Sequence, residues 1–388
     1  MNKLNFVIFF TIFLLIFFGA NAYIYFHGLH ALPAIHWLRT VYLIAFITLS
    51  VSFPLSRMIE KTALINAHHI LYWLGAFWLA AVLYLLIMVV LVDLVRVANL
   101  VLHFLPDKSS IAYQNIKLTS FVLVAASVLG FLIYGHWISH HPHIVNKEIT
   151  IHKQAGIRKE LSIAMVSDIH LGALFNKPQV DEMVEKINIL KPDLILLAGD
   201  ILDEVQTPIY RNNTGEALSH LSAPLGVYGI TGNHEYIGGA KRSVKYLESL
   251  GIKMLIDSAI LVNNEFYLVG RNDKDQKNFA GKDRMPLNAL VASINKNLPV
   301  ILMDHQPFHL NDAVNNGVDL QLSGHTHNGQ FWPFNLIVKR MFEVSHGHKQ
   351  KGTTHIYVSC GYGYWGPPIR TGSTPEIVHL KLVFAPKI

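Results

Sequence analysis

The chain has 388 residues, of which 51% are hydrophobic and only 15% are charged, and its mean hydropathy is +0.33. This composition excludes a wholly soluble protein and leaves room for two or three domains, part of which we expect in a membrane. The formal net charge is +6, but Lys and Arg are scattered and form no long run interleaved with aromatic residues, so no nucleic-acid partner is expected.

Four long apolar segments fill the first part of the chain. We expect them to be membrane-spanning helices at about residues 4–25, 36–54, 70–92 and 118–138, so that residues 1–140 form an all-α membrane domain. The first segment also fits a cleavable signal peptide, because Lys3 precedes it and Ala20-Asn21-Ala22 resembles a cleavage site. At the end of the third segment, Asp93 and Arg96 either extend to the interface, pair with each other or line a lipid entrance.

The basic residues between these segments predict the orientation of the chain. With the N-terminus inside, the inner side holds the larger group, Lys3, Arg57, Lys61, Lys147, Lys153, Arg158 and Lys159, and the outer side holds Arg39, Arg96, Lys108 and Lys117. Four spans, or the three that remain after signal cleavage, then leave the C-terminal half inside. We therefore expect a multi-pass protein of the inner (cytoplasmic) membrane with its soluble half in the cytoplasm.

Beyond about Val145, short β-type runs alternate with amphipathic helical stretches. Strands are expected at 161–166, 194–197, 227–231 and 300–303, near Leu255 and Phe266, and at 356–358 and 377–384, with helices at 180–190 and 241–250. This alternation predicts an α/β sandwich with functional residues at the strand ends. Residues 141–160 are assigned to a linker and first strand, and residues 161–388 to one soluble domain.

Polar side chains directly follow four of these strands and a fifth apolar run, Val318 to Leu322. They are Asp168 and His170, then Asp200, then Asn233 and His234, then His305, and last His325 and His327. Each motif alone also fits an ordinary surface turn. Together they supply oxygen and nitrogen donors and no thiolate, a set that suits two adjacent divalent ions of the Mn, Fe, Co or Zn kind.

The order Asp-x-His, Gly-Asp, Gly-Asn-His-Glu, His and Gly-His-x-His resembles the calcineurin-like metallophosphoesterase superfamily, over roughly Leu161 to Leu382. The resemblance implies a metallophosphoesterase β-sandwich flanked by helices. It also implies a first metal on Asp168, His170 and His327, a second on Asn233, His305 and His325, and Asp200 as the bridge between them. His234 would not be a ligand but would lie over the leaving oxygen. Oriented by Asp168 or another carboxylate, we expect it to act as a general acid to the leaving alkoxide or as a hydrogen-bond donor to the transition state.

The C-terminal stretch further resembles the membrane-associated bacterial subgroup of this superfamily. The resemblance rests on Val358-Ser359-Cys360-Gly361-Tyr362-Gly363, Gly366-Pro367-Pro368-Ile369-Arg370 and Pro375-Glu376. Arg370 is a candidate phosphate clamp in substrate binding, with an ordinary surface charge as the alternative. Two positions depart from the subgroup, since Asn328 stands where glycine is usual and Asp304 precedes His305. Neither replaces a metal ligand, so the departures concern the shape of the substrate.

These observations predict a metal-dependent phosphoric ester hydrolase that cleaves a phosphoester or pyrophosphate bond with a metal-activated hydroxide. Mn is the first metal expected, with Fe, Zn or Co as alternatives. A short linker joins the catalytic domain to four membrane spans, so the domain would work at a lipid surface. We therefore expect a phosphorylated lipid as substrate, as in related enzymes that cleave UDP-diacylglucosamine. Soluble small molecules are the alternative. A different class of function is a membrane sensor or transporter whose soluble domain binds metal without catalysis.

Overall fold

The computed structural model describes residues 3–59 and 65–386. It divides into two compact units. The helical unit contains Met1–His136 and Gly366–Ile369, and the α/β unit contains Trp137–Trp365 and Arg370–Ile388. Four long apolar helices therefore precede a mixed α/β region, which confirms the predicted fold class.

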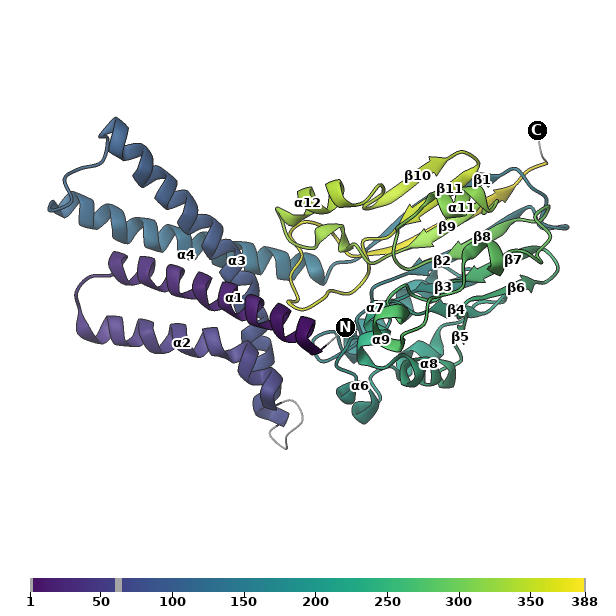
Figure 1. The fold of residues 1–388 in the computed structure, drawn as a ribbon, viewed down its shortest axis with the longest axis horizontal. Helices are drawn as coiled ribbons and strands as arrows, with labels where there is room; N and C mark the ends of the chain where they lie inside the picture. Colours follow the sequence, from purple (N-terminus) through teal and green to yellow (C-terminus); the bar gives the residue numbers. More distant parts are fainter. Residues whose placement is uncertain (1–2, 60–64, 387–388) are drawn as a thin grey trace. The chain divides into compact units, whose positions relative to one another are not determined.

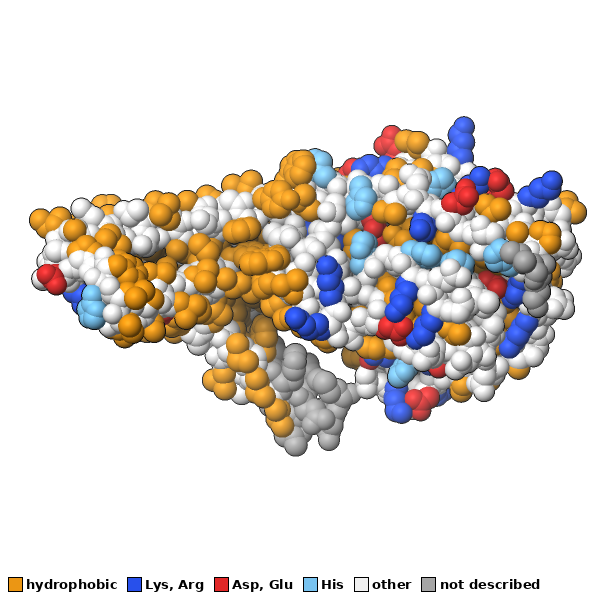
Figure 2. Space-filling model, turned by 90° about the horizontal axis from the view of Figure 1, so that it is seen from above, with side chains coloured by type: hydrophobic (Ala, Val, Ile, Leu, Met, Phe, Trp, Pro, Cys, Tyr) orange, Lys and Arg blue, Asp and Glu red, His pale blue; other side chains and the backbone are white. Residues whose placement is uncertain are grey.

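The helical unit consists of four helices, α1 Lys3–Ala31, α2 His36–Ile59, α3 Ile65–Leu102 and α4 Ile111–Ser139 (Figure 1). The parts long and apolar enough to cross a membrane are Thr11–Ala31, His36–Ile59, His68–Leu102 and Ile111–Ser139. Hydrophobic side chains are abundant and charged ones few on the face of this unit that Figure 2 shows, as expected for helices that face lipid. The helices extend past the predicted ends because their backbone hydrogen bonds continue into flanking polar residues.

Polar side chains inside the helical unit are paired. The side-chain oxygen of Asn21 accepts hydrogen bonds from Ser50 Oγ at 2.8 Å and from Trp78 Nε1 at 2.9 Å. Near the end of α3, Arg96 lies 3.0 Å from the carboxylate of Asp93, so the pairing predicted as one of three alternatives is present. Polar groups in hydrocarbon are stabilised by such partners, because no water is available to them.

The α/β unit contains two six-stranded sheets. The first has the order β1-β12-β2-β3-β4-β5, with the bounds His143–Ile151, Glu376–Phe384, Glu160–Val166, Leu194–Ala198, Val227–Ile230 and Lys253–Met254. The second has the order β10-β11-β9-β8-β7-β6, with the bounds Gly347–Lys351, Thr354–Val358, Leu320–Ser323, Val300–Met303, Phe266–Gly270 and Ser258–Val262. The predicted strands are all present, whereas β6 and β10 were not predicted.

The hydrophobic core lies between the two sheets. Ile163 and Leu196 of the first sheet belong to the same buried cluster as Ile301 and Leu322 of the second. Helix α5, Lys177–Ile189, turns the apolar positions Val180, Met183, Val184 and Ile187 inward, at the spacing expected for one helix face. The predicted helix at 241–250 is α8, Ala240–Ser249.

Within each sheet, parallel pairing brings the polar loops to one edge. Strands β2, β3 and β4 are parallel neighbours in the first sheet, and β8 and β9 are parallel neighbours in the second. Their carboxyl ends therefore lie at the same edge of each sheet, where the loops carry function in folds of this kind. All five predicted motifs follow these strands directly.

Candidate metal centre

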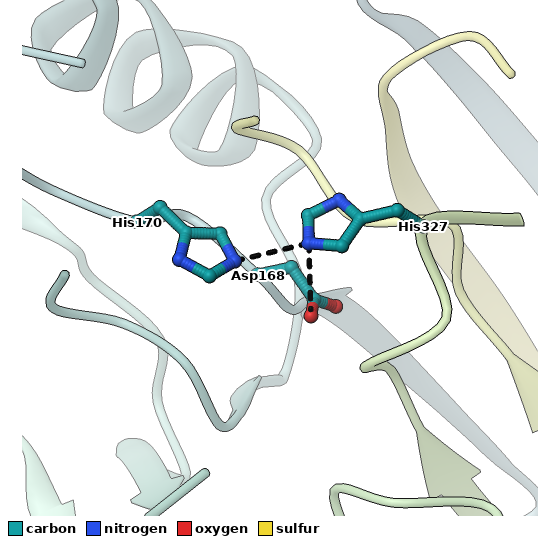
Figure 3. Close-up of side chains that lie close together, drawn as sticks. All are labelled: Asp168, His170 and His327. Carbon is teal, nitrogen blue, oxygen red and sulfur yellow. Dashed lines mark hydrogen bonds and ion pairs between the residues drawn. The ribbon is translucent and has the colours of Figure 1, made fainter. Parts of the chain in front are cut away.

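The first group of side chains joins the loop after β2 to the loop after β9. Asp168, His170 and His327 point toward one another, and their potential ligand atoms lie within 4.8 Å (Figure 3). Nε2 of His327 lies 3.0 Å from Nε2 of His170 and 3.6 Å from Oδ1 of Asp168. All three residues are buried. Two ring nitrogens and a carboxylate that face one inner point can share a cation.

The second group joins the loop after β3 to the loops after β8 and β9. It contains Asp200, His305 and His325, whose potential ligand atoms also lie within 4.8 Å. Nε2 of His305 is 3.0 Å from Oδ2 of Asp200, and Nδ1 of His325 is 2.9 Å from Oδ1 of Asn233. The structure thus gathers the four residues that the resemblance places around the second metal.

Asp200 lies between the two groups. Its Oδ2 atom is 3.9 Å from Nε2 of His170 in the first group and 3.0 Å from Nε2 of His305 in the second. Its other oxygen, Oδ1, accepts a hydrogen bond of 2.8 Å from the backbone N–H of His234. One carboxylate therefore touches both groups, as the predicted bridging position requires.

The hydrogen bonds of His305 leave one ring nitrogen available for a cation. Its Nδ1 atom lies 2.8 Å from the carbonyl oxygen of Ala198, so Nδ1 carries the proton and donates. The buried Nε2 atom makes no hydrogen bond within the described part of the chain, although it faces Asp200. A backbone partner on one nitrogen and an inward lone pair on the other are typical of metal-binding histidines.

Charge is unbalanced at this centre. Burial, together with the nearby carboxylate of Asp200, raises the pKa of Asp168. Burial alone would lower the pKa of His305, but Asp200 raises it well above the usual value. Both shifts show that the buried carboxylates attract positive charge, which divalent ions would supply in place of protons.

The backbone at the site is held in a rarely populated conformation. Asp168, His170, Asp200, His325 and His327 all have positive φ, between 46° and 72°. Such angles are uncommon for residues with a side chain and concentrate at functional sites. Close packing supports them, because a Cβ atom on Gly199 would lie 2.6 Å from Nδ1 of His305 and one on Gly324 would collide with the carboxylate of Asp168.

His234 occupies the first turn of α7, Asn233–Gly238, next to the first metal group. Its ring centroid is 4.5 Å from that of His170. Nδ1 of His234 lies 3.3 Å from Asp203 and 3.0 Å from Glu204. The orienting carboxylates are therefore Asp203 and Glu204. Asp168 does not have this role, because its oxygens accept hydrogen bonds from the backbone N–H of His325.

The acidic neighbours keep His234 protonated. Burial alone would lower the pKa of His234, but the carboxylates of Asp200, Asp203 and Glu204 raise it well above the usual value. Conversely, although burial opposes ionisation of Asp203, hydrogen bonds with His170 and His234 lower the pKa of its carboxyl group. Sequence reasoning missed Asp203 and Glu204, and the only signal was an acidic pair a few residues beyond Asp200.

Glu235 is a further residue to which the motif analysis assigned no role. Its buried carboxylate accepts hydrogen bonds from the backbone N–H groups of Asp200 at 3.1 Å, Leu202 at 2.8 Å and Gly232 at 2.7 Å. These bonds tie the loop after β3 to the loop before α7. Glu235 therefore fixes the position of Asp200 relative to His234.

Arg370 does not have either of its predicted roles. The side chain is fully buried, which excludes a surface charge. Its guanidinium donates to the carbonyl oxygens of Cys360 and Gly363 and to Oγ of Ser373, and its Nη2 lies 3.1 Å from Nδ1 of His327. With its N–H groups occupied in this way, it holds the C-terminal loop against His327 and does not clamp phosphate.

A cavity of about 530 Å³ opens beside the metal groups. On one side it is lined by Asp200, Asn233, His234, His325 and His327. On the other side the lining is apolar and comes from helix α12, Phe334–Met341, and from Trp365. None of the α12 side chains is buried, and Ile337 is 52% and Met341 65% exposed. Polar donors and an apolar wall thus face one cavity, and this wall was not predicted.

Comparison with known proteins gives consistent matches. The model of the calcineurin-like phosphoesterase family matches residues 161–329. An uncharacterized metallophosphoesterase of Helicobacter pylori is 35% identical over 263 residues, or 66% of this chain and 68% of that protein. One of Campylobacter jejuni is 30% identical over 389 residues, or 97% and 98%. The transmembrane protein with metallophosphoesterase domain of Bos taurus is 31% identical over 296 residues, or 72% and 65%.

Proposed function

The chain belongs to the calcineurin-like phosphoesterase family, and from this premise we propose that it is a membrane-anchored dinuclear phosphoesterase acting on a lipid-linked phosphoester or pyrophosphate. The family makes it a metal-dependent phosphoric ester hydrolase. The number of metal ions, the lipid character of the substrate and the location are the proposed parts.

The donor set supports two divalent ions. Asp168, His170 and His327 would hold one ion, Asn233, His305 and His325 the other, and Asp200 both. In these positions divalent ions would neutralise phosphoryl oxygens and would lower the pKa of water enough to supply a nucleophile at neutral pH. Nitrogen and oxygen donors without thiolate favour Mn, with Fe, Zn or Co as alternatives.

His234 would supply the proton that the reaction requires. The nearby carboxylates raise the pKa of His234 and so favour its protonated form, and the ring lines the same cavity as Asp200. A positioned acid lowers the barrier by donating to the leaving alkoxide as the bond to phosphorus breaks. Asp203 and Glu204 orient the ring and stabilise its positive charge before transfer.

The apolar wall of the cavity carries the proposal of a lipid-linked substrate. A soluble phosphoester would leave Ile337, Met341 and Trp365 exposed to water, whereas an acyl chain would cover them. The metal groups and this wall line one cavity. The phosphate of a single lipid molecule can therefore contact the metal groups while its acyl chain contacts the wall. The four apolar helices support the same class of substrate, since they would hold the enzyme at a lipid surface.

Two synthetic substrates test this proposal on the full-length protein with added Mn²⁺. The methyl and decyl esters of p-nitrophenyl phosphate share a leaving group and differ only in chain length. We expect kcat/KM to be at least about tenfold higher for the decyl ester, because the wall covers its chain. Equal kcat/KM values for the two esters would rule out binding of the chain to the apolar wall. Metal binding without hydrolysis of either ester would support the alternative of a non-catalytic sensor or transporter. Profiling a lipid extract with the purified protein would then identify the natural substrate.

We further propose that the protein lies in the inner (cytoplasmic) membrane with the catalytic unit on the cytoplasmic side. The excess of Lys and Arg on the side of the N-terminus supports this orientation. The proposed partners are accordingly the bilayer and a phosphorylated lipid or small molecule, with no nucleic acid.

A further inference from the structure

The helical unit contains a cavity of about 250 Å³ that is lined by residues of all four helices. Its walls are mainly apolar and include Phe46 of α2, Trp78 of α3 and Val124 of α4. An apolar cavity of ~150 Å³ holds a benzene molecule, so this one accommodates a longer hydrocarbon segment but not a whole lipid. Its lining residues belong only to the helical unit, so it is separate from the metal centre.

Basic side chains line one end of this cavity. Arg96 is paired with Asp93 at 3.0 Å, and the same carboxylate lies 3.2 Å from Nε2 of His27. The ammonium group of Lys117 donates to the carbonyl oxygen of His30 at 3.0 Å. Two cations, Arg96 and Lys117, thus stand beside one carboxylate, which leaves an excess of positive charge. The end is thus suited to an anion.

The basic end lies near a membrane surface. Helix α3 has 38 residues, considerably more than the ~20 that span the hydrocarbon core. Arg96 lies about 9 Å from the end of α3 at Leu102, at a rise of ~1.5 Å per residue. Lys117 is likewise in the first part of α4, which begins at Ile111. These positions place the cations at the level of lipid headgroups and the apolar walls at the level of the chains.

We propose that this cavity is a binding site for an anionic phospholipid, with one acyl chain between the helices and the headgroup phosphate at Lys117 and Arg96. A free anion would occupy only the basic end and leave the apolar walls uncovered. A zwitterionic lipid would fill the walls but bring its own positive charge to the basic end. An anionic lipid satisfies both parts of the cavity.

Native mass spectrometry of the full-length protein tests the site. The protein in detergent is offered equimolar dioleoyl phosphatidylglycerol and dioleoyl phosphatidylcholine, and the retained lipid is counted. We expect one phosphatidylglycerol to be retained in preference. Lys117→Gln should lower its retention about fivefold and leave phosphatidylcholine unchanged, because one cation is removed. Equal retention of the two lipids, or no effect of Lys117→Gln, would overturn the proposal.

A matched pair of variants on α4 tests the apolar part. Val124 lines the cavity, whereas Val122 is 55% exposed on the outside of the same helix. Val124→Phe should fill the space and reduce phosphatidylglycerol retention about tenfold, and Val122→Phe should leave it unchanged. The same phosphatidylglycerol retention in both variants would contradict the binding of an acyl chain in the cavity. Circular dichroism during thermal unfolding in detergent reports whether the helices of each variant are folded. If Val124→Phe does not fold, the Lys117→Gln result decides.

Discussion

At the scale of single residues, Asp200 has the largest effect to test, because one of its carboxylate oxygens faces a histidine of each metal group. Asp200→Ala removes the proposed bridge, so we expect metal content to fall and turnover of methyl p-nitrophenyl phosphate to be abolished. Metal per chain and initial rates with added Mn²⁺ measure both effects. Asp181→Ala is the control, since Asp181 is an exposed residue of α5 paired with Lys177. Full turnover in the Asp200 variant would exclude the two-metal arrangement.

The pH dependence of the reaction reports on His234. The carboxylate of Glu204 favours the protonated ring, so Glu204→Gln lowers the pKa of His234 and the proton is lost at lower pH. The alkaline limb of kcat/KM for a phosphoester with an alkoxide leaving group should therefore move to lower pH, with metal content unchanged. His234→Ala should remove this limb and reduce turnover by ~10²-fold or more. The exposed Glu185→Gln on α5 serves as control, and an unmoved limb in Glu204→Gln would show that another group is the acid.

At the scale of elements, helix α12 provides the apolar wall that we expect to bind the lipid chain. Ile337 lines the cavity, whereas the neighbouring Leu336 is 49% exposed and does not. Ile337→Asn should raise KM for the decyl ester about tenfold, because contact between the chain and the wall is lost, and leave KM for the methyl ester unchanged. Leu336→Asn should change neither value. A similar rise in both variants would mean that α12 acts through general membrane affinity and not through the cavity.

The strand ends could be predicted from the sequence because their information is local. Each of the β2, β3, β4, β8 and β9 loops carries its donors within a few residues of an apolar run, so the motifs were visible without knowledge of the sheets. The role of Glu235 depends on contacts with a distant segment, and the role of Arg370 depends on how the C-terminal loop folds around its side chain, so neither role was visible. An arginine near the end of the chain gives no sign that its guanidinium is enclosed by backbone carbonyls. Likewise, the apolar positions of α12 look like core positions, although none is buried.

At the scale of the whole molecule, the testable property is the side of the membrane on which each unit lies. The chain has one cysteine, Cys360, which is buried, and burial raises the pKa of its thiol, so the unmodified protein should not react with maleimide. Ser109, in the loop between α3 and α4, and Ser249, at the end of α8, are exposed positions for single added cysteines.

A membrane-impermeant maleimide applied to intact spheroplasts distinguishes the orientations. With an inside N-terminus, Ser109→Cys should be labelled in intact spheroplasts and Ser249→Cys only after permeabilisation, because α4 returns the chain to the inner side. The parent protein controls for reaction at Cys360, and labelling after lysis shows that both new thiols are reactive. Labelling of Ser249→Cys alone before lysis would reverse the orientation. It would place the catalytic unit outside the cell membrane, so that its lipid substrate would have to be drawn from the outer leaflet.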